Sequence, residues 1–330
     1  MHLQTDPNPR ALPGGVNAAH EPGAGALAPF GAVKTLGLPA NSHEQACTVD
    51  RWRAFQPEVN LSFLGLRRLK VMAQARRSPP SRELCFRNDA ARRWAVYFCY
   101  APDGVPRANH RFTIDRLRAE GFAILAVCAT PGPYEARRFL ALEPDALIWK
   151  ALHGYDFSGY SLGLEALASR FESIDVLVMN DSVLGPLHAL RPCLDSSPWD
   201  LTGFMTSYSV EHHIQSFAFY LKGFGRRTRR LYRRVFFRHI CFNSQGPVSL
   251  LQETRLGSAL VGSVSVGSVL TPSAEFKKNY HLLGNPKGLL DVGFPFCKRS
   301  IFTKFSDGYD QRYYRECLES YGHPDSEMVA

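Results

Sequence analysis

The feature that most constrains the fold is a series of short apolar runs, each followed by a stretch with helical periodicity. The runs are Trp94 to Tyr100, Phe122 to Cys128, Asp145 to Trp149 and Ile174 to Met179. Runs of this length that are closed by polar or turn-forming residues are typical of strands buried on both faces of a parallel sheet. The helices expected near these strands span 108–119, 134–142 and 162–171. This alternation predicts an α/β protein with a Rossmann-like, mostly parallel central sheet.

The pattern changes after the fourth run. Two further strands, Trp199 to Thr206 and His213 to Leu221, follow each other with no room for a crossover helix, so we expect the sheet to become mixed there. Helices are then expected over 226–239 and 247–260.

We divide the 330-residue chain into four parts. Residues 1–45 are rich in Pro, Gly, Ala and Asn and are predicted to be a disordered tail. Residues 46–92 form a basic, partly helical extension, in which 52–77 is a helix that docks on the domain or touches a membrane surface. The globular α/β domain spans 93–305, and 306–330 is a C-terminal helix or tail.

Several classes of protein are disfavoured by what the sequence lacks. It has no Walker A loop, no GxGxxG and no GxSxG, which disfavours nucleoside triphosphatases, dinucleotide-dependent reductases and α/β hydrolases. The eight cysteines include no CxxC pair, so neither a zinc site nor a disulfide framework is expected. No apolar run has the length of a transmembrane helix. A reduced, cytoplasmic protein is the simplest interpretation.

Polar side chains collect where the predicted strands end, and the tripeptide Asn180-Asp181-Ser182 closes the fourth strand. In open α/β sheets, ligands bind outside the carboxyl ends of the strands. A carboxylate flanked by an amide and a hydroxyl can hold a divalent cation and, through it, a diphosphate. The competing interpretation is that Asp181 and Ser182 cap the next helix. The arrangement suits a nucleotide-sugar site.

Three ordered motifs resemble those of the rhamnan synthesis protein F family, bacterial glycosyltransferases of surface polysaccharide assembly. They are Gly154-Tyr155-Asp156-Phe157, Asn180-Asp181-Ser182 with Gly185-Pro186, and His213-Ile214-Gln215-Ser216-Phe217. Weaker similarities are YAPDGVP after the first strand, QETRLG at 252–257 and FPFCKRSIF at 294–302. The resemblance implies a GT-A-like transferase for nucleotide-diphosphate sugars. It places Asn180-Asp181-Ser182 where such enzymes have an Asp-X-Asp metal motif, although the first position here is Asn.

The resemblance and the strand-end positions together suggest two sets of site residues. Asp181 is the expected contact for Mg²⁺ or Mn²⁺ and the diphosphate, and it is the first of the candidate catalytic residues. The candidate donor-binding residues are Asp103, Gly154, Tyr155, Asp156, Asn180, Ser182 and Gln215. Each has a structural alternative, such as a helix cap for Asp156 or a packed aromatic ring for Tyr155.

An inverting transferase also needs a base to accept the proton of the acceptor hydroxyl. His213 is a candidate because an imidazole titrates near neutral pH, and Asp200 and Glu211 are competing candidates. The sequence does not distinguish an inverting from a retaining enzyme.

Most of the net charge of +9 comes from residues 222–238, which hold eight basic and no acidic side chains. The sequence predicts a basic amphipathic helix here that suits an anionic membrane surface, and an ordinary solvated helix is the alternative. The arginines concerned are Arg226, Arg227, Arg229, Arg230, Arg233 and Arg234. A nucleic-acid partner is not expected, because the remaining domain is mildly acidic.

The sequence therefore predicts a cytoplasmic glycosyltransferase, peripheral on the inner face of the plasma membrane. It would move a sugar, with rhamnose the one the resemblance suggests, from a nucleotide-diphosphate donor to a growing, lipid-linked glycan. A non-catalytic subunit that binds nucleotide sugars within a polysaccharide assembly complex is the alternative, and Asn180 keeps it open.

Overall fold

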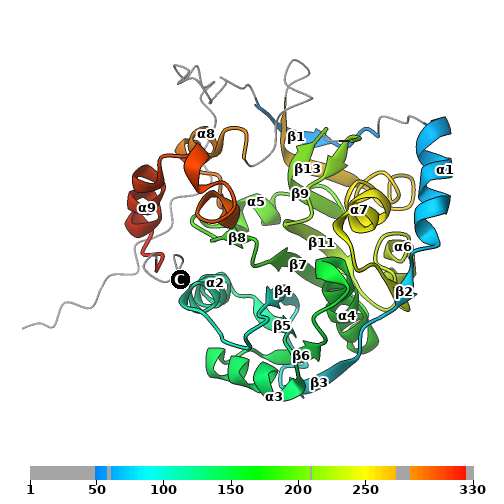
Figure 1. Ribbon diagram of the computed structural model, residues 1–330, viewed down its shortest axis with the longest axis horizontal. Helices are drawn as coiled ribbons and strands as arrows, with labels where there is room; N and C mark the ends of the chain where they lie inside the picture. The colour runs from blue at the N-terminus through cyan, green and yellow to red at the C-terminus, as the bar shows by residue number, and fades with distance from the viewer. Residues whose placement is uncertain (1–48, 58–60, 209, 273–282, 325–330) are drawn as a thin grey trace, which may run out of the picture.

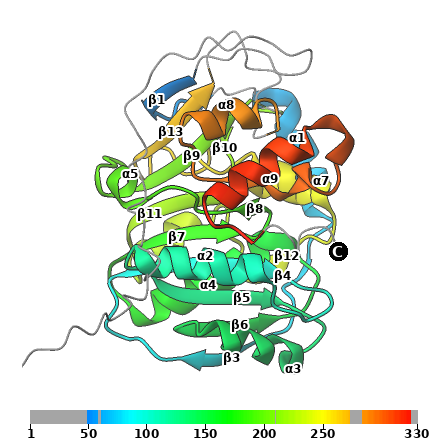
Figure 2. The ribbon, with the colours of Figure 1, turned by 90° about the vertical axis from the view of Figure 1, so that its left-hand side faces the viewer.

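The computed structural model describes residues 49–57, 61–208, 210–272 and 283–324 (Figure 1). The predicted tail at 1–45 lies outside the described residues. A ten-stranded sheet runs through the molecule in the order β1-β13-β9-β11-β7-β4-β5-β6-β3, with β10 paired to β9 (Figure 2). Its strands are β1 (Val49–Ala54), β3 (Ser81–Phe86), β4 (Arg93–Tyr100), β5 (Ala123–Ala129), β6 (Ala146–Lys150), β7 (Ile174–Asn180), β9 (Leu201–Ser207), β10 (His213–Ile214), β11 (Ala218–Phe224) and β13 (Val266–Pro272).

The centre of the sheet has doubly wound topology. β4 pairs in parallel with both β5 and β7, and β5 pairs in parallel with β6. If β4 is counted as the first strand, this order is 3-2-1-4, and the winding reverses between β4 and β7. The predicted Rossmann-like α/β fold is confirmed. The chain leaves a crevice for ligands at such a reversal, outside the carboxyl ends of the strands.

Beyond β7 the sheet is mixed, as predicted. β11 runs antiparallel to both β7 and β9, because β9 and β11 are joined without a crossover helix. The strand predicted over 213–221 is divided in two: β10 pairs with β9, and β11 continues the main sheet after a break at 215–217.

Each face of the sheet carries its own core, because successive side chains of β4 point to opposite sides. Tyr97 packs in a core that includes α2 (Ala108–Ala119), whereas Phe98 packs in a second core that includes α4 (Tyr155–Arg170). In Figure 2, α2 lies in front of the strands and α4 behind them. The helix predicted over 134–142 is one α-helical turn, α3 (Pro133–Ala136), followed by a 3₁₀ helix at Arg137–Leu142.

Both outer strands of the sheet come from the predicted extension at 46–92. β1 pairs with β13 at one edge, and β3 pairs with β6 at the other. Between them lie α1 (Leu61–Met72) and β2 (Arg76–Arg77), which pairs with β12 (Ile240–Cys241). The C-terminal part contains helix α9 (Gln311–Ser320).

The long basic helix predicted over 226–239 is wrong. Only Arg229–Tyr232 form a helix, α6. Arginines spaced four residues apart repel each other along a helix, which disfavours a longer one. The expected apolar stripe is also used inside the protein, where Tyr232, Val235 and Phe236 are buried in the core behind α4. The segment predicted as a helix over 247–260 begins as α7 (Gln245–Val248) and continues as a π-helix, Ser249–Glu253.

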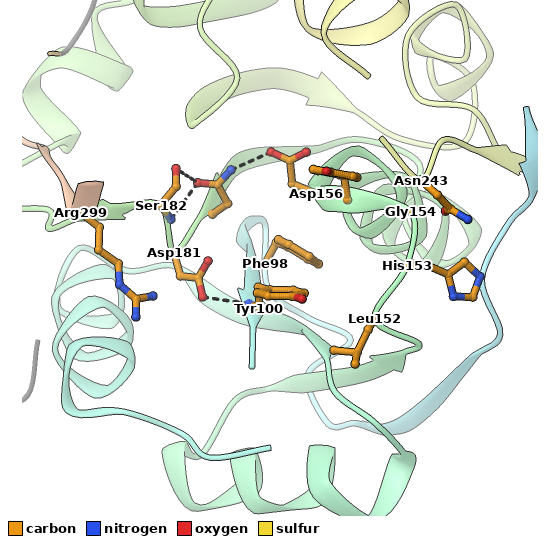
Figure 3. A pocket seen from close by; sticks show the side chains of 12 residues that line it. Phe98, Tyr100, Leu152, His153, Gly154, Asp156, Asp181, Ser182, Asn243 and Arg299 are labelled. Atoms are coloured by element: carbon orange, nitrogen blue, oxygen red, sulfur yellow. Dashed lines mark hydrogen bonds between the residues drawn. The ribbon is translucent and has the colours of Figure 1, made fainter. Parts of the chain in front are cut away.

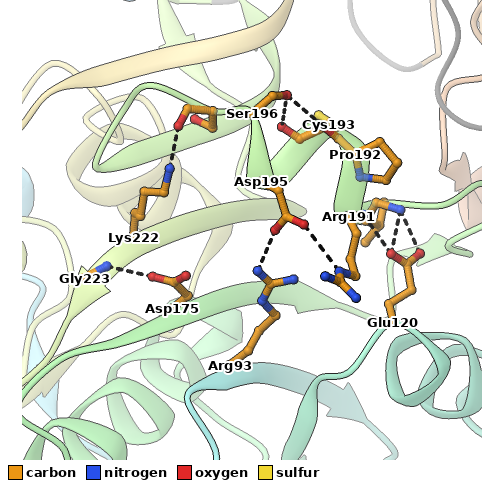
Figure 4. A network of polar contacts seen from close by, with 12 residues as sticks. Arg93, Glu120, Asp175, Arg191, Pro192, Cys193, Asp195, Ser196, Lys222 and Gly223 are labelled. Atoms are coloured by element: carbon orange, nitrogen blue, oxygen red, sulfur yellow. Dashed lines mark hydrogen bonds and ion pairs between the residues drawn. The ribbon is translucent and has the colours of Figure 1, made fainter.

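A polar network stabilises the edge of the sheet at which the parallel strands begin (Figure 4). Arg93 at the start of β4 donates a hydrogen bond to Asp195 of α5 (Arg191–Asp195) over 2.5 Å. The carboxylate of Glu120 accepts hydrogen bonds from the backbone N–H groups of Leu190 and Arg191, the residues that open α5. These contacts are structural. The carboxyl ends of the parallel strands, which bind ligands in such folds, lie on the opposite side of the molecule from this network.

Two glycines let α4 lie close against β4. A Cβ added at Gly159 would stand 2.3 Å from the Phe98 ring, and one at Gly163 would stand 2.6 Å from Val96. The close approach of α4 therefore sets the position of the Phe98 side chain.

We expect Gly159→Ala to destabilise the protein, although alanine is normally the better helix former by about 1 kcal/mol. The displaced Phe98 ring should cost about 2 kcal/mol through overpacking. Gly65→Ala in α1 is the matched control, because a Cβ added there meets no atom within 4 Å. Thermal unfolding checks this prediction, which fails if both variants are stabilised.

Candidate functional site

A cavity of about 740 Å³ opens at the carboxyl ends of β4 and β7, where the winding of the sheet reverses. Two of the three sequence motifs contribute to its wall. The lining residues are Phe98, Tyr100, Leu152, His153, Gly154, Tyr155, Asp156, Asn180, Asp181, Ser182, Asn243 and Arg299 (Figure 3). The structure therefore brings together Gly154, Tyr155, Asp156, Asn180, Asp181 and Ser182 of the predicted site.

Asp181 joins the ends of the two central strands. Its Oδ2 accepts a hydrogen bond from the backbone N–H of Tyr100 at 2.8 Å, while its own N–H donates to the carbonyl of Phe98 at 3.0 Å. The side chain is nearly buried, with 6% of its surface exposed. This double contact fixes the carboxylate at the cavity wall.

His110 of α2 gives the same carboxylate a second partner. The Nδ1 of His110 accepts a hydrogen bond from the backbone N–H of Arg107, so the ring proton of a neutral imidazole lies on Nε2. Nε2 then donates toward Asp181 Oδ2 at 3.4 Å. Among the described residues Oδ1 of Asp181 accepts no hydrogen bond, so it can accept one from a ligand in the cavity.

The side chain of Asn180 connects Asp156 and Ser182. Its amide nitrogen donates to Asp156 Oδ2 at 2.8 Å, and its amide oxygen accepts from the Ser182 hydroxyl at 2.5 Å (Figure 3). The backbone N–H of Ser182 donates to the same oxygen at 3.1 Å. Asn180 therefore acts as a structural bridge between the two motifs that line the cavity.

Asp156 has a perturbed acidity. Its pKa is raised to about 6, chiefly by burial and then by the nearby carboxylate of Glu253, against the lowering effect of the hydrogen bonds from Phe157 and Asn180 and of the Lys298 charge. Glu253 accepts a hydrogen bond from Ser216, a residue of the third motif. Near neutral pH Asp156 is ionised, and it can accept hydrogen bonds from hydroxyl groups of a ligand.

The loop at 151–154 forms one side of the cavity and depends on a buried lysine. Lys150 at the end of β6 is completely buried, and its ammonium group donates to the carbonyl of His153 at 2.9 Å. Burial lowers the pKa of Lys150 to about 8. At Gly154 the backbone adopts φ = 94°, a left-handed conformation that favours glycine, and α4 begins at the next residue.

Two exposed aromatic side chains flank the cavity. Tyr100 ends β4 with half of its surface exposed, and Tyr155 opens α4 with 43% exposed. Phe98 also lines the cavity, and the Lys150 ammonium lies 5.3 Å from its ring centroid. Exposed rings of this kind can stack on a planar base.

Two predicted residues do not line the cavity. Asp103 is on the surface, where it forms an ion pair with Arg107 at 2.6 Å. The backbone carbonyl of Asp200 accepts a hydrogen bond from the N–H of Lys222. The residue before Lys222 pairs with Val176 near the start of β7, so Asp200 lies at that end of the strands. The cavity is at the other end of these strands. The Asp200 carboxylate accepts a hydrogen bond from the backbone N–H of Ser265.

The third motif lies beside the cavity and does not line it. The carbonyl of Phe217 accepts from the N–H of Asn180, and the carbonyl of Ser216 accepts from the Tyr160 hydroxyl. His213 Nδ1 donates to the carbonyl of Glu211 at 2.8 Å, which leaves Nε2 as the acceptor. The Glu211 carboxylate is in an ion pair with Arg68.

Gln215 lies in the break between β10 and β11. Its backbone N–H donates to Met205, and its Nε2 is buried without a hydrogen-bond partner among the described residues.

The basic residues predicted at a membrane surface are partly engaged in ion pairs. Arg229 and Arg233 both bind Glu165 of α4, and Arg226 and Arg227 both contact Glu172. Arg234 donates to Ser263. Arg230 is exposed on α6.

Several lining residues were absent from the predicted site. Arg299 comes from the segment 294–302, Asn243 follows β12, and Lys298 lies next to Arg299 without lining the cavity. The sequence carried a signal for Arg299 and Lys298, because they lie in FPFCKRSIF, one of the weaker similarities to the rhamnan synthesis protein F family. No strand-end rule identified them, since they approach from outside the main sheet.

Comparison with known proteins adds little to this geometry. No family model matches the chain, and no curated protein matches it. Among solved structures, HddC from Yersinia pseudotuberculosis overlaps 61% of this chain and 98% of its own at 9% identity and a TM-score of 0.34. The 4-diphosphocytidyl-2C-methyl-D-erythritol synthase from Anaerococcus prevotii overlaps 61% and 95% at 11% identity and a TM-score of 0.33. Similarity this low establishes neither a shared fold nor a shared activity.

The bridging role of Asn180 can be tested with Asn180→Asp, which replaces the donor 2.8 Å from Asp156 by a second carboxylate. The two acids would then share a proton, which raises the pKa of the pair. A group whose pKa is raised in the folded state stabilises the fold at low pH, and this contribution is lost as the pH rises through the raised pKa. We expect the variant to be about 2 kcal/mol less stable at about pH 8 and nearer to wild type at about pH 5. Thermal unfolding at both pH values measures this, and a deficit that is the same at both would contradict the bridge.

Proposed function

We propose that this chain is a glycosyltransferase that moves a sugar from a nucleotide-diphosphate donor to a growing surface polysaccharide. The observation that carries the proposal is the convergence of Gly154-Tyr155-Asp156 and Asn180-Asp181-Ser182 on one cavity at the reversal point of the sheet. Asp156 and Asn180 are 24 residues apart in the sequence, and the hydrogen bond between them joins the two motifs into one polar wall. This is where α/β folds of this type bind their ligands.

The lining residues suit the parts of such a donor. The aromatic side of the cavity can hold the base, and the Asp156 carboxylate can accept hydrogen bonds from ribose or sugar hydroxyls. Asp181 Oδ1 lies beside the end of β7, where it can accept a hydrogen bond from a sugar hydroxyl, and we place the diphosphate on the side of the Ser182 hydroxyl. Rhamnose as the sugar and a lipid-linked glycan as the acceptor follow from the resemblance to the rhamnan synthesis protein F family.

The transfer step requires that an acceptor hydroxyl attack the anomeric carbon as the bond to the diphosphate oxygen breaks. The acceptor proton goes to a base in an inverting enzyme. We propose His213 for this role, since its Nε2 is the acceptor of the ring and the residue pairs with Ser207 at the carboxyl end of β9, the same end of the strands as the cavity. Glu211 is less suited because Arg68 holds its carboxylate, and Asp200 lies at the wrong edge of the sheet.

The second candidate is a non-catalytic subunit that binds nucleotide sugars within a polysaccharide assembly complex. The observation that favours it is that both polar atoms of Asn180 are used in internal hydrogen bonds, as in a site kept for its shape. Within the described residues no helix is long and apolar enough to cross a bilayer. We propose a peripheral position on the inner face of the plasma membrane, where a lipid-linked acceptor is presented.

The two candidates are separated by measuring thermal stabilisation with a panel of nucleotide-diphosphate sugars, followed by donor hydrolysis and transfer. Stabilisation with turnover supports the transferase, and stabilisation without turnover supports the binding subunit. If none of the donors stabilises the protein, both are wrong.

With the donor so identified, we expect Asp181→Asn to lower transfer at least about 100-fold, because the carboxylate fixed at the cavity wall is lost. The amide oxygen can still accept from Tyr100, so the fold should be retained. Asp200→Ala is the control, since it removes an aspartate at the opposite edge of the sheet and should leave transfer unchanged. Rates of sugar transfer and far-UV circular dichroism check both, and full turnover by Asp181→Asn would refute the assignment.

A further inference from the structure

A divalent cation is the usual partner of an Asp-X-Asp motif, but the oxygens of 180–182 are largely engaged here. Asn180 Oδ1 accepts two hydrogen bonds from Ser182, and Asp181 Oδ2 accepts from Tyr100 and His110. Mg²⁺ and Mn²⁺ bind six oxygen or nitrogen ligands, of which Asp181 Oδ1 would supply one. No group of three or more His, Cys, Asp or Glu side chains in the described part of the chain is arranged to hold a metal. The residues present do not fit a cation site.

Two cationic side chains lie at the same place. The short strand β14 (Cys297–Lys298) pairs with β8 (Val183–Leu184), and this pairing sets Lys298 opposite Val183. The ammonium group of Lys298 donates to the Ser182 hydroxyl at 3.0 Å, and the backbone N–H of Arg299 donates to the Ser182 carbonyl at 3.0 Å. β14 thus delivers a lysine and an arginine to the end of β7.

The two cations have different surroundings. Lys298 is largely desolvated, which lowers its pKa, while the charges of Glu253 and Asp156 act to keep it protonated. Arg299 directs its guanidinium into the cavity (Figure 3), and among the described residues it has no carboxylate within ion-pair distance. A guanidinium in a cavity without a carboxylate partner is suited to binding an oxyanion through two parallel hydrogen bonds.

We infer that Lys298 and Arg299 neutralise the diphosphate of the donor in place of a divalent cation. The inference rests on the proposed function and specifies how its leaving group is bound. When the sugar–oxygen bond breaks, its electron pair stays on the diphosphate oxygen, and the added negative charge faces Arg299 and Lys298. Fixed cations lower the cost of this charge as a metal ion would.

The test measures nucleoside diphosphate binding by calorimetry on the full chain, with EDTA or with Mn²⁺, for the uridine, thymidine and guanosine forms. We expect one of them to bind with equal affinity, within about twofold, under both conditions. Arg299→Gln should weaken that binding roughly 10- to 100-fold and leave the affinity for the corresponding nucleoside unchanged. Lys304→Gln is the matched control, since Lys304 is an exposed lysine that contacts Phe305 outside the cavity.

The outcomes separate this inference from the function on which it rests. Binding that requires Mn²⁺, or equal binding by Arg299→Gln, overturns the inference and leaves the proposed function in place. If no nucleoside diphosphate binds with or without Mn²⁺, the proposed function itself fails. Lys298→Met gives a second variant, which should also weaken the diphosphate and spare the nucleoside.

A separate observation concerns α1, whose outer face is apolar. Leu66, Leu69 and Met72 are spaced three residues apart and therefore lie along one side of the helix. Their exposed fractions are 68%, 71% and 36%. The inner side is fixed to the protein, because Val71 packs against the core and Arg68 binds Glu211 and the carbonyl of Leu250.

Basic side chains surround this apolar face. Arg67 and Lys70 are exposed on α1 itself, and Arg76 and Arg77 are exposed in β2. Figure 1 shows α1, β2 and α6 on one side of the molecule, and the Ser78 hydroxyl donates to the carbonyl of Arg238. The end of the basic segment 226–238 thus contacts the chain just after β2.

We propose that α1, with the arginines around it, binds an anionic lipid surface. The leucines would enter the headgroup region while the cations contact lipid phosphates, as in other interfacial helices. The basic residues around the apolar face favour anionic lipid over a second copy of this equally basic chain. This surface replaces the amphipathic helix predicted over 226–239, whose apolar residues are inside the core.

Flotation with vesicles of phosphatidylcholine, with and without phosphatidylserine, tests this surface. We expect binding only to the anionic vesicles, and the double change Leu66→Gln and Leu69→Gln should weaken it roughly 10-fold or more. Tyr134→Ser is the control, because Tyr134 is 72% exposed on α3, away from α1 (Figure 1). Unchanged flotation of the leucine variant overturns the proposal. So does a dimer in light scattering that this variant converts to a monomer, since a second copy would then cover α1.

Discussion

The site depends on one interaction, the hydrogen bond from the Tyr100 N–H to the Asp181 carboxylate. β4 and β7 are neighbours in the sheet, yet their chains leave it in different directions where the winding reverses. Sheet pairing no longer holds the strands beyond this point, so a side chain must do so. Asp181 makes this connection because its own N–H still donates to the carbonyl of Phe98, which places its carboxylate opposite the N–H of Tyr100. The reversal of the winding between β4 and β7 therefore explains both the cavity and the Asp181–Tyr100 hydrogen bond beside it.

The remaining polar residues extend from this anchor in a single chain of contacts. Asn180 carries the connection to Asp156 on one side and to Ser182 on the other, and Ser182 carries it to Lys298. Four segments distant in sequence are thereby fixed relative to one another. In such a chain, an amide with one donor group and one acceptor joins a carboxylate to a hydroxyl, which a second carboxylate cannot do without sharing a proton. The Asn at position 180 is therefore explained by its neighbours.

The parts of the fold governed by local pattern could be predicted from the sequence. The buried strands and the helix Ala108–Ala119 follow from periodicity, and Asn180-Asp181-Ser182 follows from its place at a strand end. The conformation of the segment 226–239 could not be predicted, because its apolar residues have the spacing of a helix but pack in the core against α4 without forming a long one. Lys298 and Arg299 were missed for another reason: their position depends on pairing between strands more than a hundred residues apart. Asp200 was placed in the site because strand direction was unknown.

The pairing of β1 with β13 also bears on how the chain assembles. Val49 lies opposite Pro272, so β1 is synthesised about 220 residues before its partner and cannot pair until β13 has left the ribosome. Until then the edge of β9 has no neighbour on that side, and an unpaired edge invites pairing with other chains. β3 meets β6 much earlier, at Ser81 and Lys150. The β3 side of the sheet therefore forms first during synthesis, and the pairing of β1 with β13 completes the other side.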